Sequence, residues 1–463
     1  MRVRVAIAAI LCALTALGPV VVQSNAAPAP AAATTGLPIF SYAKTNSTPL
    51  PWDATPLKSV MADTTMVGSP YVGLTTSGAT LLAWRTPLGF VMVNQTLLTG
   101  ATTTICIQCQ GRQVPLAASD PVVFIDAQDN LHTIFLSTTG QLTLITIWSD
   151  IRPGWEHFQA KPVSRAFLTV RDLSTPAGVA FATTPSTTSV SDGLGLIGRT
   201  TTNHVVYMHV ALTWPLRTTT NDVRDVTTMI NDAGVSGNPT WLPGTSTFVA
   251  TNSAGHIIQY RLASDCPLAP TTCTAVTTQD ITQATSAPLT TTDLSLTMTP
   301  TGVALVGLTV TGVATLFRGT GAAGVYTWND IDISTPSSAP SLADAPFVIN
   351  SGSTIYLAAK ARNWGDLFII SNETGANTWK SVDVSITGGS DAQTVGGGID
   401  GVVTQSGLVL YAGGVATPPP TGTGLYAIPQ SKNSAAIADG WPSIGITGGL
   451  GTLSAPWVAV KSG

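Results

Sequence analysis

Two short clusters of residues carry the side chains best suited to hold a ligand. Arg362-Asn363-Trp364-Gly365-Asp366 combines an aromatic ring with a guanidinium and a carboxylate, and Trp155-Glu156-His157 combines a ring with an acid and an imidazole. A tryptophan ring offers a large, rigid surface that can stack on the face of a sugar, while polar groups beside it bond to hydroxyls. We therefore predict a ligand-binding role for Arg362, Trp364, Asp366, Trp155, Glu156 and His157, with ordinary loop packing as the alternative.

The acids and histidines give no catalytic constellation. Glycoside hydrolysis needs two carboxylates about 5–10 Å apart, and the aspartates that recur along the chain form no local signature for it. We expect His132, His204 and His256 to open the third strand of consecutive repeat units, where capping a turn is favoured over binding a metal. Neither H-E-x-x-H nor G-x-S-x-G occurs. We predict no catalytic residue, no metal and no cofactor.

The segment Gly193-Leu194-Gly195-Leu196-Ile197-Gly198 spells the dinucleotide-binding pattern G-x-G-x-x-G. That chemistry requires the pattern between a strand and a helix of a βαβ unit. Its neighbours here read as strands, so we predict a glycine-rich strand instead.

The N-terminus has the layout of a secretory signal. Two arginines precede an apolar run from Val5 to Val22, and Ser24-Asn25-Ala26-Ala27 follows it. A positive start, an apolar stretch and an A-x-A-like end predict a signal peptide over residues 1–26. An uncleaved membrane anchor is the alternative. We expect residues 27–36, rich in Ala and Pro, to be a flexible linker and the mature protein to be secreted and extracellular.

Four cysteines remain once Cys12, within the apolar run, is removed with the signal peptide. An even number in an exported chain indicates disulfides. The short separations favour two local pairs, Cys106 with Cys109 and Cys266 with Cys273. A zinc site of four thiolates is the alternative, although the second spacing is wide for it.

The composition favours strands over helices and gives no charged partner. Charged residues make up 10% of the 463, against about 25% in a typical soluble protein, and glutamate occurs only twice. A chain rich in Thr, Ser and Gly favours strands with hydroxyl-bearing outer faces and glycine turns. The net charge of −4, without a basic cluster, argues against a nucleic-acid partner. No stretch after the signal is long and apolar enough to span a bilayer.

Two motifs recur along the chain. The first joins a small or acidic residue, a proline and an apolar strand, in Ser69-Pro70-Tyr71-Val72, Asp120-Pro121-Val122-Val123, Asn238-Pro239-Thr240-Trp241, Asp344-Ala345-Pro346-Phe347-Val348 and Ser454-Ala455-Pro456-Trp457-Val458. The second is a tryptophan, two polar residues and alternating apolar positions, beginning at Trp52, Trp148, Trp328, Trp379 and Trp441. Two further apolar runs lie between these motifs, so each unit has four short strands. Trp84 falls outside the repeat, as do Trp155 and Trp364.

Units of about fifty residues with four strands each predict the blades of a β-propeller. We expect seven complete units, beginning near residues 69, 120, 176, 238, 291, 344 and 397. An eighth would be split, with residues 457–460 pairing with residues 39–43 and the Trp52 region to close the ring and hide both sheet edges. The sequence thus predicts one all-β domain over residues 37–463, a propeller of seven or eight four-stranded blades closed by its N- and C-terminal segments.

The segment Ser371-Asn372-Glu373-Thr374-Gly375-Ala376-Asn377-Thr378-Trp379 resembles the Asp-box of sialidase-type propellers, S-x-D-x-G-x-T-W, with glutamate for aspartate and one extra residue. The segment from Gly321 to Trp328 ends in the same Thr-Trp pair. The recurrence of a tryptophan-bearing outer strand once in each unit also resembles bacterial and fungal propeller lectins. The first resemblance implies glycoside hydrolysis with an arginine triad and a tyrosine nucleophile, and the second implies carbohydrate binding.

Taken together, these patterns predict a secreted, non-catalytic binding protein that recognises glycan or cell-envelope polysaccharide through propeller loops. A secreted, sialidase-like glycoside hydrolase or lyase on the same scaffold is one alternative, and a structural or protein-interaction propeller is another. Fold alone does not choose among them. A pair of carboxylates converging near the ring axis would favour the enzyme.

Overall fold

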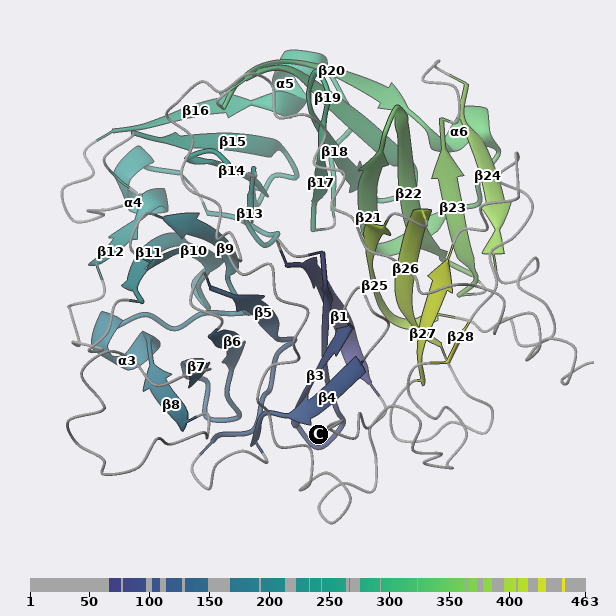
Figure 1. Ribbon diagram of the computed structural model, residues 1–463. Coiled ribbons are helices and arrows are strands. Elements are labelled where there is room, and N and C mark those ends of the chain that lie inside the picture. The colour runs from purple at the N-terminus through teal and green to yellow at the C-terminus, as the bar shows by residue number, and fades with distance from the viewer. Residues whose placement is uncertain are drawn as a thin grey trace, which may run out of the picture.

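The computed structural model describes residues between Met66 and Gly445, apart from connecting segments of which 149–166, 385–394 and 430–443 are the longest. The described residues form seven four-stranded sheets, each with its strands in chain order. Figure 1 shows these sheets around a common middle, and the first strands of most neighbouring sheets contact one another there. Each first strand is therefore the innermost of its sheet.

The strands and short helices have the following bounds. The strands, sheet by sheet, are β1 (Val67–Leu74), β2 (Thr80–Arg85), β3 (Val91–Thr96), β4 (Thr102–Cys106); β5 (Val122–Ile125), β6 (Leu131–Leu136), β7 (Leu142–Trp148), β8 (Phe167–Asp172); β9 (Ser186–Val190), β10 (Gly193–Arg199), β11 (Val205–Ala211), β12 (Asp222–Asp225); β13 (Thr240–Trp241), β14 (Thr247–Thr251), β15 (Ile257–Leu262), β16 (Val276–Asp280); β17 (Ser295–Thr299), β18 (Gly302–Leu308), β19 (Ala314–Ala322), β20 (Val325–Asp332); β21 (Leu342–Ser351), β22 (Thr354–Ala361), β23 (Leu367–Ser371), β24 (Lys380–Asp383); β25 (Val395–Thr404), β26 (Gly407–Gly414), β27 (Gly424–Pro429) and β28 (Ile444–Gly445). The helices are α3 (Ser174–Ala177), α4 (Val226–Ile230), α5 (Ile281–Thr285) and α6 (Ser334–Ser337).

The all-β class and the four-stranded units are confirmed. Most innermost strands begin within a few residues of the predicted unit starts, but the third unit was wrong. It was expected near residue 176, whereas its strand β9 begins at Ser186 because the residues before it form α3 and a connecting segment. The segments expected to pair into an eighth blade, with the signal peptide and linker, lie outside the described residues.

An apolar cluster fills each junction between neighbouring sheets. One of them joins the first described sheet, through Met66 and Trp84, to the last, through Val402 and Val409. Fully burying a side chain of this size contributes about 1.5–3 kcal/mol. Side-chain packing therefore links the last described sheet to the first. Trp84, which falls outside the tryptophan repeat, lies in β2, is 3% exposed and belongs to this core.

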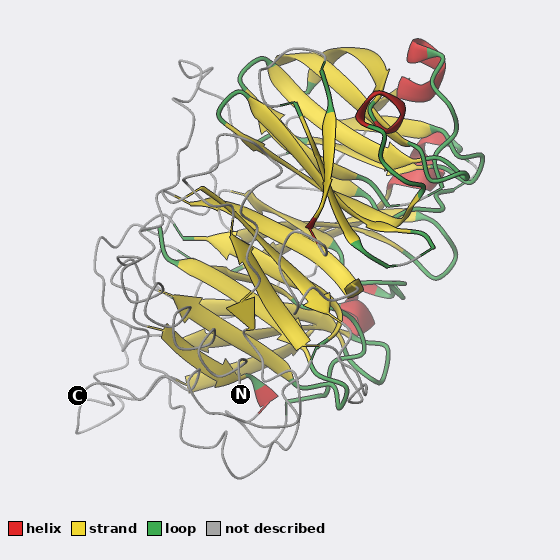
Figure 2. Ribbon diagram, turned by 90° about the vertical axis from the view of Figure 1, so that its right-hand side faces the viewer, coloured by secondary structure: helices red, strands yellow, loops and turns green. Residues whose placement is uncertain are grey.

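The two ends of the strands form two faces of the ring. Because neighbouring strands are antiparallel, the turns between second and third strands and the connections after fourth strands meet at one face. The four helices lie there (Figure 2), and we call it the helix face. The connections between third and fourth strands leave from the opposite side, which we call the connection face.

Four fourth strands end in a repeated motif of aspartate, an apolar residue and serine or threonine: Asp172-Leu173-Ser174, Asp225-Val226-Thr227, Asp280-Ile281-Thr282 and Asp332-Ile333-Ser334. The carboxylate accepts an N–H group of the following helical turn, as from Gln283 to Asp280 at 2.8 Å. The apolar residue is fully buried. The hydroxyl accepts the first N–H group of the third strand, as from Ile257 to Thr282 at 2.9 Å. This motif locks each third strand to the helix face.

The predicted tryptophan motif is right for two copies and wrong for one. Trp328 lies in β20 and Trp379 directly precedes β24, both in or beside a fourth strand and both buried. Trp148 ends β7, a third strand, because residues 149–166 separate it from the fourth strand β8. Trp52 and Trp441 lie outside the described residues.

The G-x-G-x-x-G segment is the strand β10, as predicted. A Cβ atom at Gly198 would lie 2.7 Å from a ring carbon of Phe181, and one at Gly195 would lie 3.0 Å from the Tyr207 hydroxyl. The glycines therefore make room for neighbouring rings.

Cys106 ends β4 and Cys266 follows β15, and both are fully buried. Their expected partners Cys109 and Cys273 lie outside the described residues, so both disulfides stay predictions. No helix among the described residues is long and apolar enough to cross a membrane.

Replacing Thr282 by valine tests the repeated motif. Valine keeps the shape of threonine but removes the acceptor of the Ile257 N–H group, which is buried. We expect Thr282→Val to lower the free energy of unfolding by about 1–3 kcal/mol, measured by urea denaturation. Thr285→Val is the matched control, because that hydroxyl only donates back to carbonyl oxygens of its own helix. Equal effects of the two substitutions would contradict the role given to the motif.

Candidate functional site

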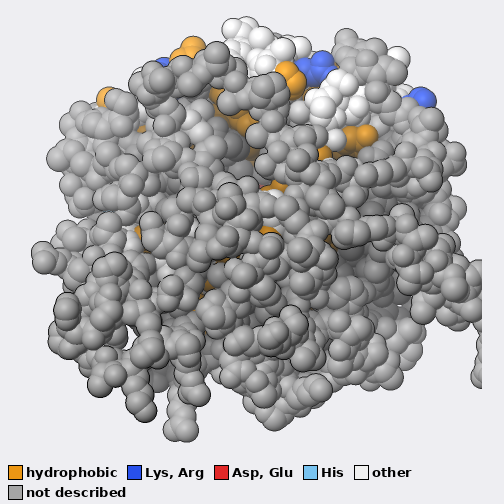
Figure 3. Space-filling model, in the orientation of Figure 1, with side chains coloured by type: hydrophobic (Ala, Val, Ile, Leu, Met, Phe, Trp, Pro, Cys, Tyr) orange, Lys and Arg blue, Asp and Glu red, His pale blue; other side chains and the backbone are white. Residues whose placement is uncertain are grey.

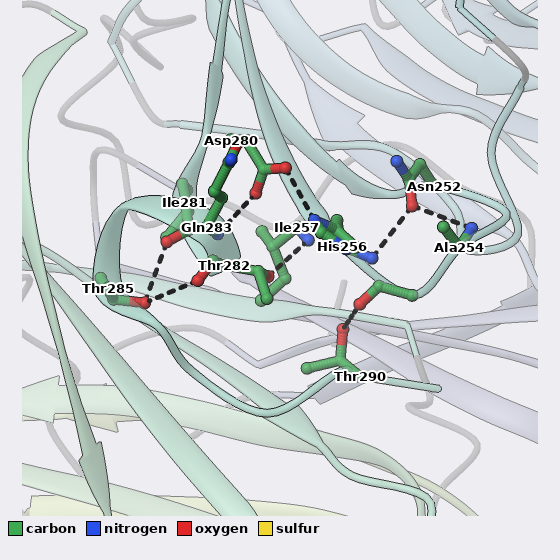
Figure 4. Close-up of polar contacts among 11 residues, drawn as sticks. Asn252, Ala254, His256, Ile257, Asp280, Ile281, Thr282, Gln283, Thr285 and Thr290 are labelled. Atoms are coloured by element: carbon green, nitrogen blue, oxygen red, sulfur yellow. Dashed lines mark hydrogen bonds and ion pairs between the residues drawn. The ribbon is translucent and has the colours of Figure 1, made fainter.

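His204 and His256 occupy equivalent positions directly before the third strands β11 and β15. Their Nδ1 atoms lie 2.7 Å from the Oδ2 atoms of Asp225 and Asp280. Figure 4 shows Asp280 shared between His256 and the first turn of α5. Burial raises the pKa of Asp225, but hydrogen bonds from His204 and from Thr228 outweigh it and hold that pKa below its usual range. The predicted position directly before a third strand is confirmed for both histidines, and each side chain bonds to the aspartate that caps the following helix.

His132 was expected at the same position and does not lie there, because it belongs to the second strand β6. Its Nε2 atom lies 2.9 Å from Asp126 Oδ2 and its Nδ1 atom 3.0 Å from Thr146 Oγ1. This order of acid, imidazole and hydroxyl is that of a nucleophilic triad. However, His132 is 0% exposed and Thr146 is 1% exposed. No substrate reaches the hydroxyl, so the arrangement is part of the core.

Polar side chains at the starts of the innermost strands are joined from sheet to sheet on the helix face. We call this set the polar arc; its members are Ser69, Ser119, Asp120, Thr183, Thr184, Asn238 and Asp293. Several belong to the proline motif found in the sequence, which explains why a polar residue precedes the proline. The arc runs through the first five sheets.

The first half of the polar arc is centred on Asp120. Its Oδ2 atom accepts the Ser69 N–H group at 2.8 Å, and its carbonyl oxygen accepts the Thr184 hydroxyl at 2.6 Å. Arg85 Nη2 lies 3.7 Å from Asp120 Oδ1, and the two side chains are 21% and 37% exposed. Burial raises the pKa of Asp120, although Ser69 and Arg85 act against it.

The second half of the polar arc is centred on Asn238. Its backbone N–H and side-chain amide donate to the two oxygens of Asp293 at 2.7 Å each. The Thr183 hydroxyl donates to Asn238 Oδ1 at 2.7 Å. The hydrogen bonds of these side chains therefore connect neighbouring sheets.

A separate polar cluster lies at the junction of the last and first sheets. Asp400 in β25 accepts the Val72 N–H group at 2.7 Å and the Gly401 N–H group at 2.8 Å. Tyr411 stands directly opposite Asp400 in β26, and Tyr71 precedes Val72 in β1. Burial raises the pKa of Asp400 to about 7, against the effect of the two N–H groups. The pKa values of Tyr71 and Tyr411 are raised, first by burial and then by Asp400.

The structure places only part of the predicted binding residues. Arg362 lies in the turn between β22 and β23 on the helix face, where its Nη1 atom donates to the Val310 carbonyl oxygen of the neighbouring sheet at 2.9 Å. The Asp366 carbonyl oxygen accepts the Ala361 N–H group at 2.8 Å in the same turn. Trp364, Trp155, Glu156 and His157 lie outside the described residues, and their role stays a prediction.

Sequence reasoning missed Asp400, Tyr71, Tyr411 and the pairing of Arg85 with Asp120. Tyr71 and Asp120 sit in the proline motif, where they were counted as repeat structure. The strand of Asp400 has no proline copy, and its only sequence signal was a lone aspartate between glycines and apolar residues. Contacts between sheets bring these residues together, and such contacts are not visible in local spacing.

No family model and no curated protein matches the chain. Among solved structures, it is similar to the BP39L lectin from Burkholderia pseudomallei, with 11% identity, a TM-score of 0.48, and 82% of this chain and 99% of that chain covered. It is also similar to an Aleuria aurantia lectin in complex with alpha-methyl-L-fucoside (10% identity, TM-score 0.39, 84% and 97% covered) and to the phage phi92 endosialidase (8%, 0.35, 68% and 55%). At such low identities and TM-scores we draw no functional conclusion from them. The Asp-box type is not confirmed, since Thr327 and Trp328 lie inside β20 and Glu373 lies outside the described residues.

The raised pKa of Asp400 predicts how stability depends on pH. The folded protein holds this proton up to about pH 7, whereas the carboxyl group of an unfolded chain releases it near its ordinary pKa of 3.8. Protonated Asp400 therefore contributes its full share of the free energy of unfolding below about pH 3.8. This contribution is lost as the pH rises through about 7. We expect the wild type to lose stability across this window, by up to roughly 1.4 kcal/mol per pH unit. Asp400→Asn should flatten the dependence in urea denaturation; an unchanged slope in that variant would assign the effect to other groups.

Proposed function

We propose that the protein is a secreted, non-catalytic binding protein that recognises carbohydrate through the connection face of its ring. One observation carries this proposal: the connections on that face differ widely between otherwise repeated sheets. Residues 149–166 join β7 to β8, whereas residues 323–324 suffice between β19 and β20. Segments that vary on a constant scaffold are where binding residues concentrate.

The helix face has the opposite character. Five of its turns between second and third strands follow one plan, in which a Thr, Ser or Asn side chain accepts the N–H group four residues on. Carbonyl oxygens of these turns accept N–H groups of the next sheet, as in Gly89 to Ala117 at 2.7 Å. Because these hydrogen bonds hold the turns against the neighbouring sheets, the turns have little freedom to change conformation around a ligand.

This division separates the two predicted clusters. Trp155-Glu156-His157 belongs to the connection from β7 to β8, which leaves the ring at the connection face. Arg362 belongs to a turn on the helix face and already bonds to the neighbouring sheet. We therefore propose that Trp155 and Glu156 contact the ligand and that Arg362 supports the ring.

Carbohydrate is the ligand class that best fits these groups. Among the described side chains visible in Figure 3, which views the connection face, none is acidic, and apolar, uncharged and basic ones appear. Trp155 offers a ring able to stack on the face of a sugar, and Glu156 beside it offers a carboxylate that can accept a sugar hydroxyl.

A hydrolase is the second candidate, because two carboxyl groups approach the same innermost strand. Asp120 accepts the Ser69 N–H group and Asp400 accepts the Val72 N–H group, both in β1. Burial raises both pKa values. Carboxylates converging near the axis are what this alternative requires.

A glycan array with the mature chain, from residue 27, tests the proposal. We expect binding of a defined set of neutral glycans without release of reducing ends. Trp155→Ala should weaken it roughly tenfold, or about 1.4 kcal/mol. Leu88→Ala, at an exposed position of the helix face, is the control and should bind normally.

Three results would contradict the proposal. Binding lost in Trp364→Ala but kept in Trp155→Ala would move the site to the helix face. Release of reducing ends that disappears in Asp400→Asn would establish the hydrolase. A blank array with correctly folded protein would favour a structural or protein-interaction role.

A further inference from the structure

Three titratable side chains at the junction of the last and first sheets are not used by the proposed contacts on the connection face. They are Asp400, Tyr71 and Tyr411, from three different strands and two sheets. The Val72 and Gly401 N–H groups hold one oxygen each of the Asp400 carboxyl group. The carboxyl group is thereby fixed in orientation, which a binding group needs.

The two phenol groups have no hydrogen-bond partner among the described residues. Neither the Tyr71 nor the Tyr411 hydroxyl makes a hydrogen bond to any residue in the described part of the chain. A half-buried phenol group without a protein partner is available to bond to water or to a ligand. All three residues are half-buried.

No positively charged side chain among the described residues is paired with Asp400. Tyr71 faces it from β1 and Tyr411 from β26. On β21, which packs on the other side of β25, Asp344 is already paired with Lys360 at 3.5 Å. On the far side of β1, Arg85 is beside Asp120 at 3.7 Å. No described arginine or lysine therefore neutralises the Asp400 carboxylate.

We propose that Asp400, Tyr71 and Tyr411 form a binding subsite for one unit of a neutral, polyhydroxylated ligand, with the ionised carboxylate accepting a ligand O–H group and the phenols donating to ligand oxygens. A sugar hydroxyl both donates and accepts, so this mixed set fits it. A phosphate or carboxylate ligand would instead be repelled by Asp400. The inference rests on the proposed carbohydrate-binding function but places an additional subsite near the ring axis.

Binding of the ligand at this subsite requires that Asp400 has lost its proton. Burial holds the pKa of Asp400 at about 7, and the ligand requires the ionised form. Affinity should therefore rise with pH through neutrality, by roughly 10- to 30-fold between about pH 5.5 and about pH 8.5. A subsite on groups that do not titrate in this range would have no such dependence.

Isothermal titration with the methyl glycosides of galactose, mannose and fucose at these two pH values tests the inference on the full mature chain. We expect at least one glycoside to bind with the pH dependence stated above. Asp400→Asn keeps an acceptor for the Val72 N–H group and should bind weakly and equally at both pH values. Tyr71→Phe and Tyr411→Phe should each weaken binding at the higher pH. Tyr326→Phe, the same change in the outer strand β20, is the matched control and should bind as wild type. Thermal unfolding of each variant shows whether it is folded.

The two proposals fail in different ways. Glycoside binding that is independent of pH, or unchanged in Asp400→Asn, would overturn the subsite. An array that is positive and sensitive to Trp155→Ala, without any glycoside bound at either pH, would also overturn the subsite while leaving the proposed function standing. A blank array together with no glycoside binding would overturn both.

Discussion

The inner edge of each sheet is the constraint on which this ring depends. The first strand of a sheet pairs with its second strand on one side only, so half of its N–H groups point toward the axis and need acceptors from elsewhere. Side chains of neighbouring first strands supply them. Ser295 and Thr297 of β17 accept the Val348 and Asn350 N–H groups of β21 at 2.9 and 3.0 Å. Asp400 does the same for Val72 across the junction that joins the last sheet to the first.

This requirement explains the unusual composition. Short oxygen-bearing side chains reach a backbone N–H group one strand away, whereas long charged ones do not fit between closely packed strands. Threonine and serine are therefore abundant while charged residues make up only 10% of the chain. It also explains the polar residue before two of the prolines, because Asp120 and Asn238 bond to a neighbouring sheet where the first strand begins. Apolar clusters then fill each junction outward from the axis.

Local sequence patterns correctly predicted the features that depend on a single strand or turn. Alternating apolar runs with glycine turns gave the four-stranded units, and the proline motif placed most innermost strands. Features that depend on contacts between sheets were missed or misplaced. Trp148 was assigned to a fourth strand because the length of the connection after β7 breaks the spacing of the repeat. The grouping of Asp400 with Tyr71 and Tyr411 involves residues more than three hundred positions apart, as the Val72 bond illustrates, and no local motif could reveal it.

Hydrogen exchange of the backbone amides tests the central claim most directly, because it reports each N–H group separately. The Val348 and Asn350 amides lie on the inner edge and bond only to side chains of the neighbouring sheet. The account predicts slow exchange at both in the wild type and fast exchange at both in the double variant Ser295→Ala, Thr297→Val, with the other amides of β21 still protected. Equal protection of Val348 and Asn350 in the wild type and the variant would mean that side chains do not satisfy the inner edges, and the account would be contradicted.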